Sequence, residues 1–277
     1  MKTRIITALV ATLIFLPFLI FSETIAFPCI MAFAAVMGVV EMHKCIGEKS
    51  LTVLLPSCLV AALLPVCARL YANEQAFFNF AHKILVVYVF YLAVVAVFSK
   101  GKKDISAMAM IYVTVCFIVN GFSSIVLLRD YPYGQYIYLL VFICPWMTDI
   151  FAYFTGYFLG KHKLIPDVSP KKTVEGAIGG IVFCTLSLVL YGFVISSIVA
   201  ELKANYLAFV CMGIVLSVVS QCGDLVFSLI KRKYGIKDYG RLMPGHGGIL
   251  DRFDSVIASA PFVLLLFDLS GIFRLFY

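Results

Sequence analysis

The stretch GAIGGIVFCTLSLVLYGFVISSIV, residues 176–199, carries no charged side chain. A helix needs about 20 mostly apolar residues to cross the hydrocarbon core of a bilayer, so this stretch predicts a transmembrane helix. The pattern recurs along the chain, and we expect about nine transmembrane helices. They are predicted at residues 5–21, 24–40, 51–68, 76–98, 105–128, 135–160, 176–199, 205–230 and 255–276.

The composition favours the same fold class. Of the 277 residues, 62% are hydrophobic and 13% are charged, whereas roughly 25% are charged in soluble domains. A water-soluble globule of this size cannot bury so much apolar surface. We therefore predict an all-α, polytopic membrane helical bundle in which residues 1–277 form a single integral membrane domain. Disordered chains, disulfide-stapled secreted domains and soluble nucleic-acid-binding proteins are excluded.

The positive charges predict the topology. The net charge is +7, and most Lys and Arg residues fall into alternate loops. Because cytoplasmic loops carry an excess of Lys and Arg, this asymmetry predicts a cytoplasmic N-terminus. The basic start Met1-Lys2-Thr3-Arg4 and the apolar run behind it imitate a signal peptide. No small-residue cleavage site follows in good context, so we interpret this segment as a retained first helix.

Two polar stretches on the predicted cytoplasmic side carry the candidate chemistry. One is SLIKRKYGIKDYGRLMPGHGGILDRFDS, residues 228–255. Its glycines let backbone N–H groups approach phosphate oxygens, and its lysines and arginines bind phosphate. Asp251 and Asp254 are three residues apart and share a helix face. Two carboxylates on one face suit a divalent cation such as Mg²⁺.

An acidic residue lies inside the apolar span before that stretch. Gln221, Asp224, Ser228 and Lys231 fall on one stripe of a helix. An aspartate at the bilayer centre costs about 2.5–3.5 kcal/mol on insertion scales, and such residues usually mark function. A basic cytoplasmic loop of ordinary kind explains the lysines. It does not explain the carboxylate, the His-Gly-Gly turn and the Asp-Arg-Phe-Asp run together.

The other stretch is DIFAYFTGYFLGKHKLIPDVSPKKTVEG, residues 149–176. Asp149 lies in an apolar span and is a second functional candidate. We expect Thr173 or a neighbour to cap the following helix, and a helix N-terminus beside Lys171 and Lys172 is also an anion site. Close helix packing is indicated by two GxxxG pairs, Gly156/Gly160 and Gly176/Gly180.

Both stretches resemble the signature of phosphatidate cytidylyltransferases, also called CDP-diacylglycerol synthases. The matching positions of the later stretch are Ser228, Lys231-Arg232, Lys237-Asp238, Gly240, His246-Gly247-Gly248 and Asp251-Arg252-Phe253-Asp254. Those of the earlier stretch are Asp149, Ala152-Tyr153, Gly156, Gly160-Lys161-His162-Lys163-Leu164, Pro166 and the run from Ser169 to Gly176. Tyr157 departs from the family pattern, which often has a basic residue there, and Met243 replaces the usual Ile, Leu or Phe.

The resemblance implies an enzyme that converts CTP and phosphatidic acid into CDP-diacylglycerol and pyrophosphate. The implied reaction is a metal-assisted, in-line nucleotidyl transfer in phospholipid biosynthesis. It would take place at the cytoplasmic face of the cell (inner or plasma) membrane, in a multi-pass protein. The implied partners are CTP, phosphatidic acid and the lipid bilayer, without nucleic acid, and a homodimer is expected only by analogy with the family.

The resemblance also implies the roles of individual residues. Mg²⁺ or another divalent cation, with room for a second cation, is expected on Asp224 and Asp251, and both are predicted to be catalytic together with Lys172. The predicted substrate-binding residues are Ser169, Lys171, Lys172, Thr173, Ser228, Lys231, Arg232, Lys237, His246, Gly247, Gly248 and Arg252. Supporting positions around them are predicted at Asp149, Glu175, Gln221 and Asp254.

Two other functions stay open from the sequence. The first is a related membrane enzyme that uses CTP differently, such as a CTP-dependent polyprenol kinase or a synthase acting on an ether-lipid phosphate. The second is a secondary transporter, in which polar residues at interrupted spans would bind substrate and ions. The complete signature favours the cytidylyltransferase, and the clustering of carboxylates beside cytoplasmic loops disfavours the transporter.

Overall fold

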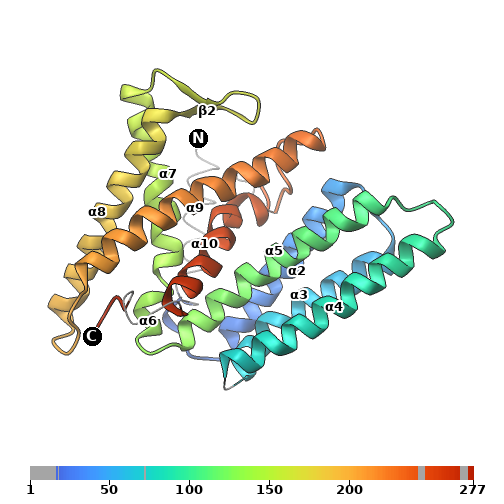
Figure 1. Cartoon of the computed structure of the whole chain (residues 1–277), viewed down its shortest axis with the longest axis horizontal. Helices are drawn as coiled ribbons and strands as arrows, with labels where there is room; N and C mark the ends of the chain where they lie inside the picture. Colours follow the sequence, from blue (N-terminus) through green and yellow to red (C-terminus); the bar gives the residue numbers. More distant parts are fainter. Residues whose placement is uncertain (1–16, 18, 72, 243–246, 269–273) are drawn as a thin grey trace. The chain divides into compact units, whose positions relative to one another are not determined.

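The structure is a computed structural model, and it describes residues 17, 19–71, 73–242, 247–268 and 274–277 (Figure 1). Helices make up nearly all of its regular structure. The helices are α2 (Ala26–Ile46), α3 (Leu51–Leu70), α4 (Glu74–Phe98), α5 (Ile105–Asp130), α6 (Gly134–Ile137), α7 (Leu140–Leu159), α8 (Val174–Ile198), α9 (Tyr206–Lys233) and α10 (Leu250–Asp268). Two short strands, β1 (Lys163–Ile165) and β2 (Ser169–Thr173), lie between α7 and α8.

This architecture confirms the predicted all-α polytopic bundle. Within the described residues, seven helical segments are long and apolar enough to cross a membrane. Each of the predicted spans from 24–40 to 205–230 coincides with one of them within a few residues. The predicted span 5–21 and the end of 255–276 lie largely outside the described residues. The number of nine spans and the cytoplasmic N-terminus stay predictions.

The chain divides into two compact units. Unit 1 comprises residues 1–130 and 233–253, and unit 2 comprises residues 131–232 and 254–277. Each unit is therefore assembled from two separate segments, and the first turn of α10 belongs to unit 1 while the rest of that helix belongs to unit 2. The prediction of one integral membrane domain over residues 1–277 stays a prediction.

Unit 1 contains the antiparallel helices α2 to α5. Helix α2 packs on α3 and α5, and α4 packs on both α3 and α5 (Figure 1). Val39, Ile118 and Phe122 are fully buried between them. In contrast, Phe90 and Phe98 of α4 are 70% and 78% exposed. Large apolar side chains on the outside of a helix bundle are what a lipid environment requires, because lipid tails are themselves apolar.

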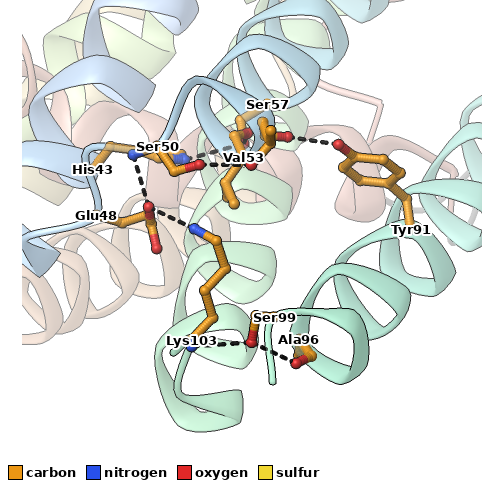
Figure 2. A network of polar contacts seen from close by, with 10 residues as sticks. His43, Glu48, Ser50, Val53, Ser57, Tyr91, Ala96, Ser99 and Lys103 are labelled. Atoms are coloured by element: carbon orange, nitrogen blue, oxygen red, sulfur yellow. Dashed lines mark hydrogen bonds and ion pairs between the residues drawn. The ribbon is translucent and has the colours of Figure 1, made fainter. Parts of the chain in front are cut away.

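A polar network joins the α2–α3 turn to the α4–α5 loop. Glu48 Oε1 accepts hydrogen bonds from the Ser50 backbone N–H at 2.8 Å and from Lys103 Nζ at 2.9 Å (Figure 2). Burial raises the pKa of Glu48, but the bonds from Lys103 and Ser50 and the Lys103 charge lower it more, so its pKa lies below the ordinary value. Glu48 thus stays ionised at neutral pH and joins two connections of unit 1.

Unit 2 is built on close contact between α7 and α8. A Cβ at Gly176 would lie 2.7 Å from the Ala152 carbonyl oxygen, and one at Gly179 would lie 2.3 Å from Thr155 Oγ1. These distances are too short for a side chain, so the two backbones meet only because glycine occupies these positions. Gly156 likewise faces Thr173, with 2.8 Å between a Cβ there and Thr173 Oγ1. The packing role predicted for the GxxxG pairs is confirmed.

The strands β1 and β2 form an antiparallel hairpin in what the sequence indicated only as a polar loop. Lys163 pairs with Thr173, and Ile165 pairs with Ser169. Thr173 ends the hairpin and caps α8, since its hydroxyl accepts a hydrogen bond from the Gly176 N–H at 3.1 Å. The predicted helix cap is confirmed, and the hairpin holds Lys171 and Lys172 directly before the N-terminus of α8.

Candidate functional site

Unit 2 contains a pocket of about 450 Å³ at the hairpin, which we call the site pocket. The end of α7, the hairpin, the start of α8 and one residue of α9 line it. The sequence-predicted side chains on its wall are Asp149, Lys171, Lys172, Thr173 and Gln221. The fold therefore gathers residues from both ends of the 149–176 stretch and from the 221–231 stripe around one cavity.

A charge pair connects the site pocket to α9. Lys172 Nζ contacts Asp224 Oδ2, and about a quarter of each side chain is exposed. Ser228 Oγ lies 3.5 Å from Asp224 Oδ1, one helical turn further along α9. The carboxylate predicted to bind a cation is thus already matched with a cationic group. Lys172 is also a wall residue of the site pocket, although its ammonium is buried against Asp224.

Asp254 adds a buried carboxyl group to unit 2. Its residue is 8% exposed, and its carboxyl interacts electrostatically with Asp224, Lys231 and Asp149. Helices α9 and α10 come close here because a Cβ at Gly223 would lie 2.4 Å from Ala258 Cβ. Unit 2 therefore brings together the acidic residues that the sequence placed on three separate spans, apart from Asp251.

Two predicted residues bind the ends of the hairpin instead of lining the site pocket. Arg232 Nε donates to the Val168 carbonyl oxygen at 3.3 Å, which ties the end of α9 to the hairpin turn. Glu175 accepts from the backbone N–H groups of Lys161 and His162 and pairs with His162 Nδ1 at 2.6 Å. Both contacts hold the hairpin that carries Lys171 and Lys172.

The other half of the predicted site lies in unit 1, on the loop before α10. Asp251 Oδ2 accepts hydrogen bonds from the backbone N–H groups of Tyr239 at 2.8 Å and Gly248 at 2.9 Å. Gly247 has a φ of +90°, a backbone conformation that favours glycine. Lys237 and Arg252 are exposed on this loop and the first turn of α10. His246 lies outside the described residues.

The sequence reasoning missed Glu41. Its carboxylate accepts hydrogen bonds from the backbone N–H groups of Ile249 and Leu250 at 3.0 and 2.9 Å. The predicted span 24–40 ended one residue before Glu41, but α2 continues to Ile46 and the residue is only 4% exposed. The available signal was an acidic side chain continuing an apolar helix, since such residues usually have a partner or a function.

The predicted metal ligands belong to different units, Asp224 to unit 2 and Asp251 to unit 1, so their joint role stays a prediction. Among the described residues, no group of three or more His, Cys, Asp or Glu side chains is arranged to hold a metal ion. This finding is compatible with Mg²⁺, which commonly uses one or two carboxylates together with substrate phosphates and water. In this structure the Asp224 carboxylate pairs with the Lys172 ammonium, and its role as a metal ligand stays a prediction.

Comparison with known proteins covers nearly the whole chain. The model of the cytidylyltransferase family matches residues 2–270. A phosphatidate cytidylyltransferase of Bacillus subtilis (strain 168) is 38% identical over 280 residues, covering 97% of this chain and 98% of that protein. A phosphatidate cytidylyltransferase of Staphylococcus haemolyticus (strain JCSC1435) is 34% identical over 269 residues, covering 96% and 98%. This multi-pass membrane protein therefore belongs to the cytidylyltransferase family.

Proposed function

We propose that the protein is a phosphatidate cytidylyltransferase, which forms CDP-diacylglycerol and pyrophosphate from CTP and phosphatidic acid. The observation that carries the proposal is the near full-length similarity to relatives of that name, at 32–38% identity. The site pocket supports it independently, because lysines, a helix N-terminus and carboxylates meet there beside membrane helices. That combination suits a phosphorylated lipid and a nucleotide.

The chemistry requires little from a general base. Phosphatidate is a phosphomonoester with a second pKa of about 6, so it is largely a dianion at neutral pH. One of its phosphate oxygens attacks the α-phosphorus of CTP, a new P–O bond forms, and the bond to the leaving pyrophosphate breaks. The main obstacle is the repulsion between two polyanions. Catalysis is therefore mainly positioning and charge neutralisation.

The residues of unit 2 provide positive charge and hydrogen-bond donors for this task. In the proposal, Lys171 and Lys172 bind phosphate oxygens in the site pocket, with the capped N-terminus of α8 beside them. When CTP or phosphatidate enters the site pocket, the Lys172 ammonium leaves Asp224 and pairs with a substrate phosphate instead. Asp149 and Gln221 border the pocket and orient what binds there. Ser169, Ser228, Lys231 and Arg232 would contribute further contacts from the hairpin and the end of α9.

The residues of unit 1 supply the remaining groups. Asp251 is proposed as a metal ligand together with Asp224, while Lys237, His246, Gly247, Gly248 and Arg252 contact the nucleotide phosphates. A divalent cation such as Mg²⁺, when bound there, would neutralise charge on the phosphates and orient the reacting groups. The lipid tails would remain among the apolar helices. The reacting head group would lie at the proposed cytoplasmic face of the cell membrane.

The decisive experiment uses purified protein in lipid–detergent micelles with CTP, phosphatidic acid and Mg²⁺, with and without a chelator. The proposal expects a CMP-bearing lipid and one pyrophosphate per lipid formed, and it expects chelation to stop both. Formation of CDP and a phosphorylated alcohol would instead identify a CTP-dependent kinase. Substrate counterflow in liposomes without nucleotide would identify a transporter.

A further inference from the structure

Glu41 lies on a membrane helix of unit 1, yet its carboxylate binds the loop that carries the cytidylyltransferase signature. Oε1 accepts from the Ile249 N–H at 3.0 Å, and Oε2 accepts from the Leu250 N–H at 2.9 Å. The residue is 4% exposed, so water does not compete for these bonds. More than 200 residues of chain separate the acceptor from the two donors.

These bonds satisfy the N-terminus of α10. The first N–H groups of a helix have no partner within that helix, and their aligned dipoles favour a negative charge. A side chain of the preceding loop usually fills this role. Here helix α2 supplies the cap, so the start of α10 is fixed to α2 and not merely to its own loop.

Two glycines of the signature are shaped around the same carboxylate. A Cβ at Gly240 would lie 2.4 Å from Glu41 Oε1, and a Cβ at Gly248 would lie 2.2 Å from it. Neither position can carry a side chain unless Glu41 moves. The Glu41 carboxylate therefore fills the space where a side chain at either glycine would lie. The absence of side chains at Gly240 and Gly248 allows the loop to contact α2.

The next carboxylate of the loop continues this arrangement. Asp251 follows Leu250 directly, and its Oδ2 binds the N–H groups of Tyr239 and Gly248. Glu41 thus binds the two N–H groups that follow Gly248, and Asp251 binds the N–H of Gly248 itself. A shift of the Ile249–Leu250 backbone would displace Asp251, which begins the Asp-Arg-Phe-Asp run.

We propose that Glu41 is a positioning residue for the cytidylyl transfer, acting by fixing the Ile249–Leu250 backbone and, through it, Asp251. This inference rests on the proposed function of the same loop. Glu41 itself does not touch substrate in this account. Its effect reaches the reaction through Asp251 and the loop backbone, so a change there should alter turnover and the Mg²⁺ requirement together.

The test compares Glu41→Gln with Glu48→Gln. The glutamine at position 41 has nearly the same shape, but only one of its two terminal atoms can accept a hydrogen bond, so one of the two N–H bonds is lost. Glu48 is the matched control, because it is another glutamate of unit 1 whose carboxylate binds a backbone N–H, that of Ser50, and it lies just beyond α2 (Figure 2). Both variants remove one negative charge from unit 1.

We expect Glu41→Gln to lower kcat by about tenfold or more, in the range seen when a partner of a metal ligand is removed. The Mg²⁺ concentration for half-maximal activity should rise, and Glu48→Gln should change neither quantity. Glu41→Asp keeps the charge but is one methylene shorter, so it should give an intermediate loss. Glu41→Asp also provides the test if the Glu41→Gln protein cannot be produced in folded form. The inference would be overturned if both Glu41 variants, measured per folded molecule, had the same kcat and the same Mg²⁺ dependence as the wild type.

Hydrogen exchange of the substrate-free protein separates this inference from the proposed function. The Ile249 and Leu250 amides should exchange faster in Glu41→Gln than in the wild type or in Glu48→Gln. Unchanged exchange at these amides would refute the role of Glu41, whatever the enzyme's activity. If the wild type forms no CDP-diacylglycerol, the proposed function fails, and the exchange result alone then decides whether Glu41 fixes this loop.

Discussion

Lys172 is the residue on which the charge balance of the site pocket depends. Its ammonium pairs with Asp224, and the residue lies in β2 on the wall of the site pocket, directly before Thr173, which caps α8. In the proposed reaction, the Lys172 ammonium pairs with the Asp224 carboxylate before substrate binds and with a substrate phosphate afterwards. This exchange leaves the Asp224 carboxylate without its cationic partner, so it requires another cation to take the place of the ammonium there.

We expect Lys172→Ala to raise the KM for CTP or phosphatidic acid and to lower kcat/KM by roughly tenfold or more, since a hydrogen bond to a charged group contributes about 1.5–3 kcal/mol. Lys172→Arg, which keeps the charge, should retain part of the activity. Lys203→Ala, in the α8–α9 connection away from the pocket, is the control. Steady-state kinetics with both substrates measure these effects, and unchanged kcat and KM in Lys172→Ala would remove this residue from the site.

Asp224 and Asp251 are the proposed metal ligands, and replacing either should abolish CDP-diacylglycerol formation. Asparagine keeps the size of the side chain but removes the negative charge that a hard divalent cation requires. The variants Asp224→Asn and Asp251→Asn should still insert in the membrane, and added Mg²⁺ should not restore them. The control Asp167→Asn changes an exposed carboxylate at the hairpin turn. Near-normal turnover of either variant with Mg²⁺ would contradict the metal role.

At the scale of elements, the α2–α3 turn and the α4–α5 loop are joined by the Glu48–Lys103 pair (Figure 2). The pKa of Glu48 is lowered in the folded protein, where burial raises it less than Lys103 and Ser50 lower it. A lowered folded pKa means that the stabilisation is present above the unfolded pKa of about 4.3. It is lost as the pH falls through the folded pKa.

The contribution of Glu48 to the thermal stability of the detergent-solubilised protein should therefore stay constant from pH 7 down to about pH 4.3 and decrease below that pH in the wild type, but not in Glu48→Gln. The gap in Tm between the two proteins should be constant near neutrality, should begin to narrow below the unfolded pKa of about 4.3, and should close once the pH lies below the lowered pKa of the folded carboxyl. Measurement of Tm against pH for both proteins checks this. A gap that stays constant down to the acid limit would mean that the Glu48 charge does not stabilise the fold.

Helices and caps could be predicted from the sequence where they depend only on residues close together in the chain. A run such as 176–199 is apolar along its whole length, so its length and composition alone indicate the helix that the structure has at Val174–Ile198. The Thr173 cap was predictable for the same reason, because it involves residues only three apart. The hairpin was not, since its strands are three and five residues long and carry no clear alternation.

Contacts between distant segments could not be predicted from periodicity. Glu41 binds amides more than 200 residues away, and nothing in the spacing around it indicates that partner. The Asp251 bond to Tyr239 depends on the turn of a glycine-rich loop, which the sequence leaves open. By contrast, Lys172 and Asp224, which were assigned to the site on the resemblance, do meet in the structure.

At the scale of the whole molecule, the signature residues are divided between two units. Unit 2 holds the site pocket with Lys172 and Asp224, and unit 1 holds the loop with Asp251 and its support from Glu41. The chain passes from one unit to the other directly after α5, at the end of α9 and in the first turn of α10. The proposed reaction requires residues of both units.

The most direct test of the proposed reaction follows the phosphate groups of CTP. Purified protein is given phosphatidic acid and Mg²⁺ with CTP labelled at either the α- or the γ-phosphate, and the lipid and aqueous products are separated. The account predicts that the α-label enters the lipid as CDP-diacylglycerol and that the γ-label is released as pyrophosphate. Transfer of the γ-label to lipid, or no labelled lipid from either nucleotide, would contradict it.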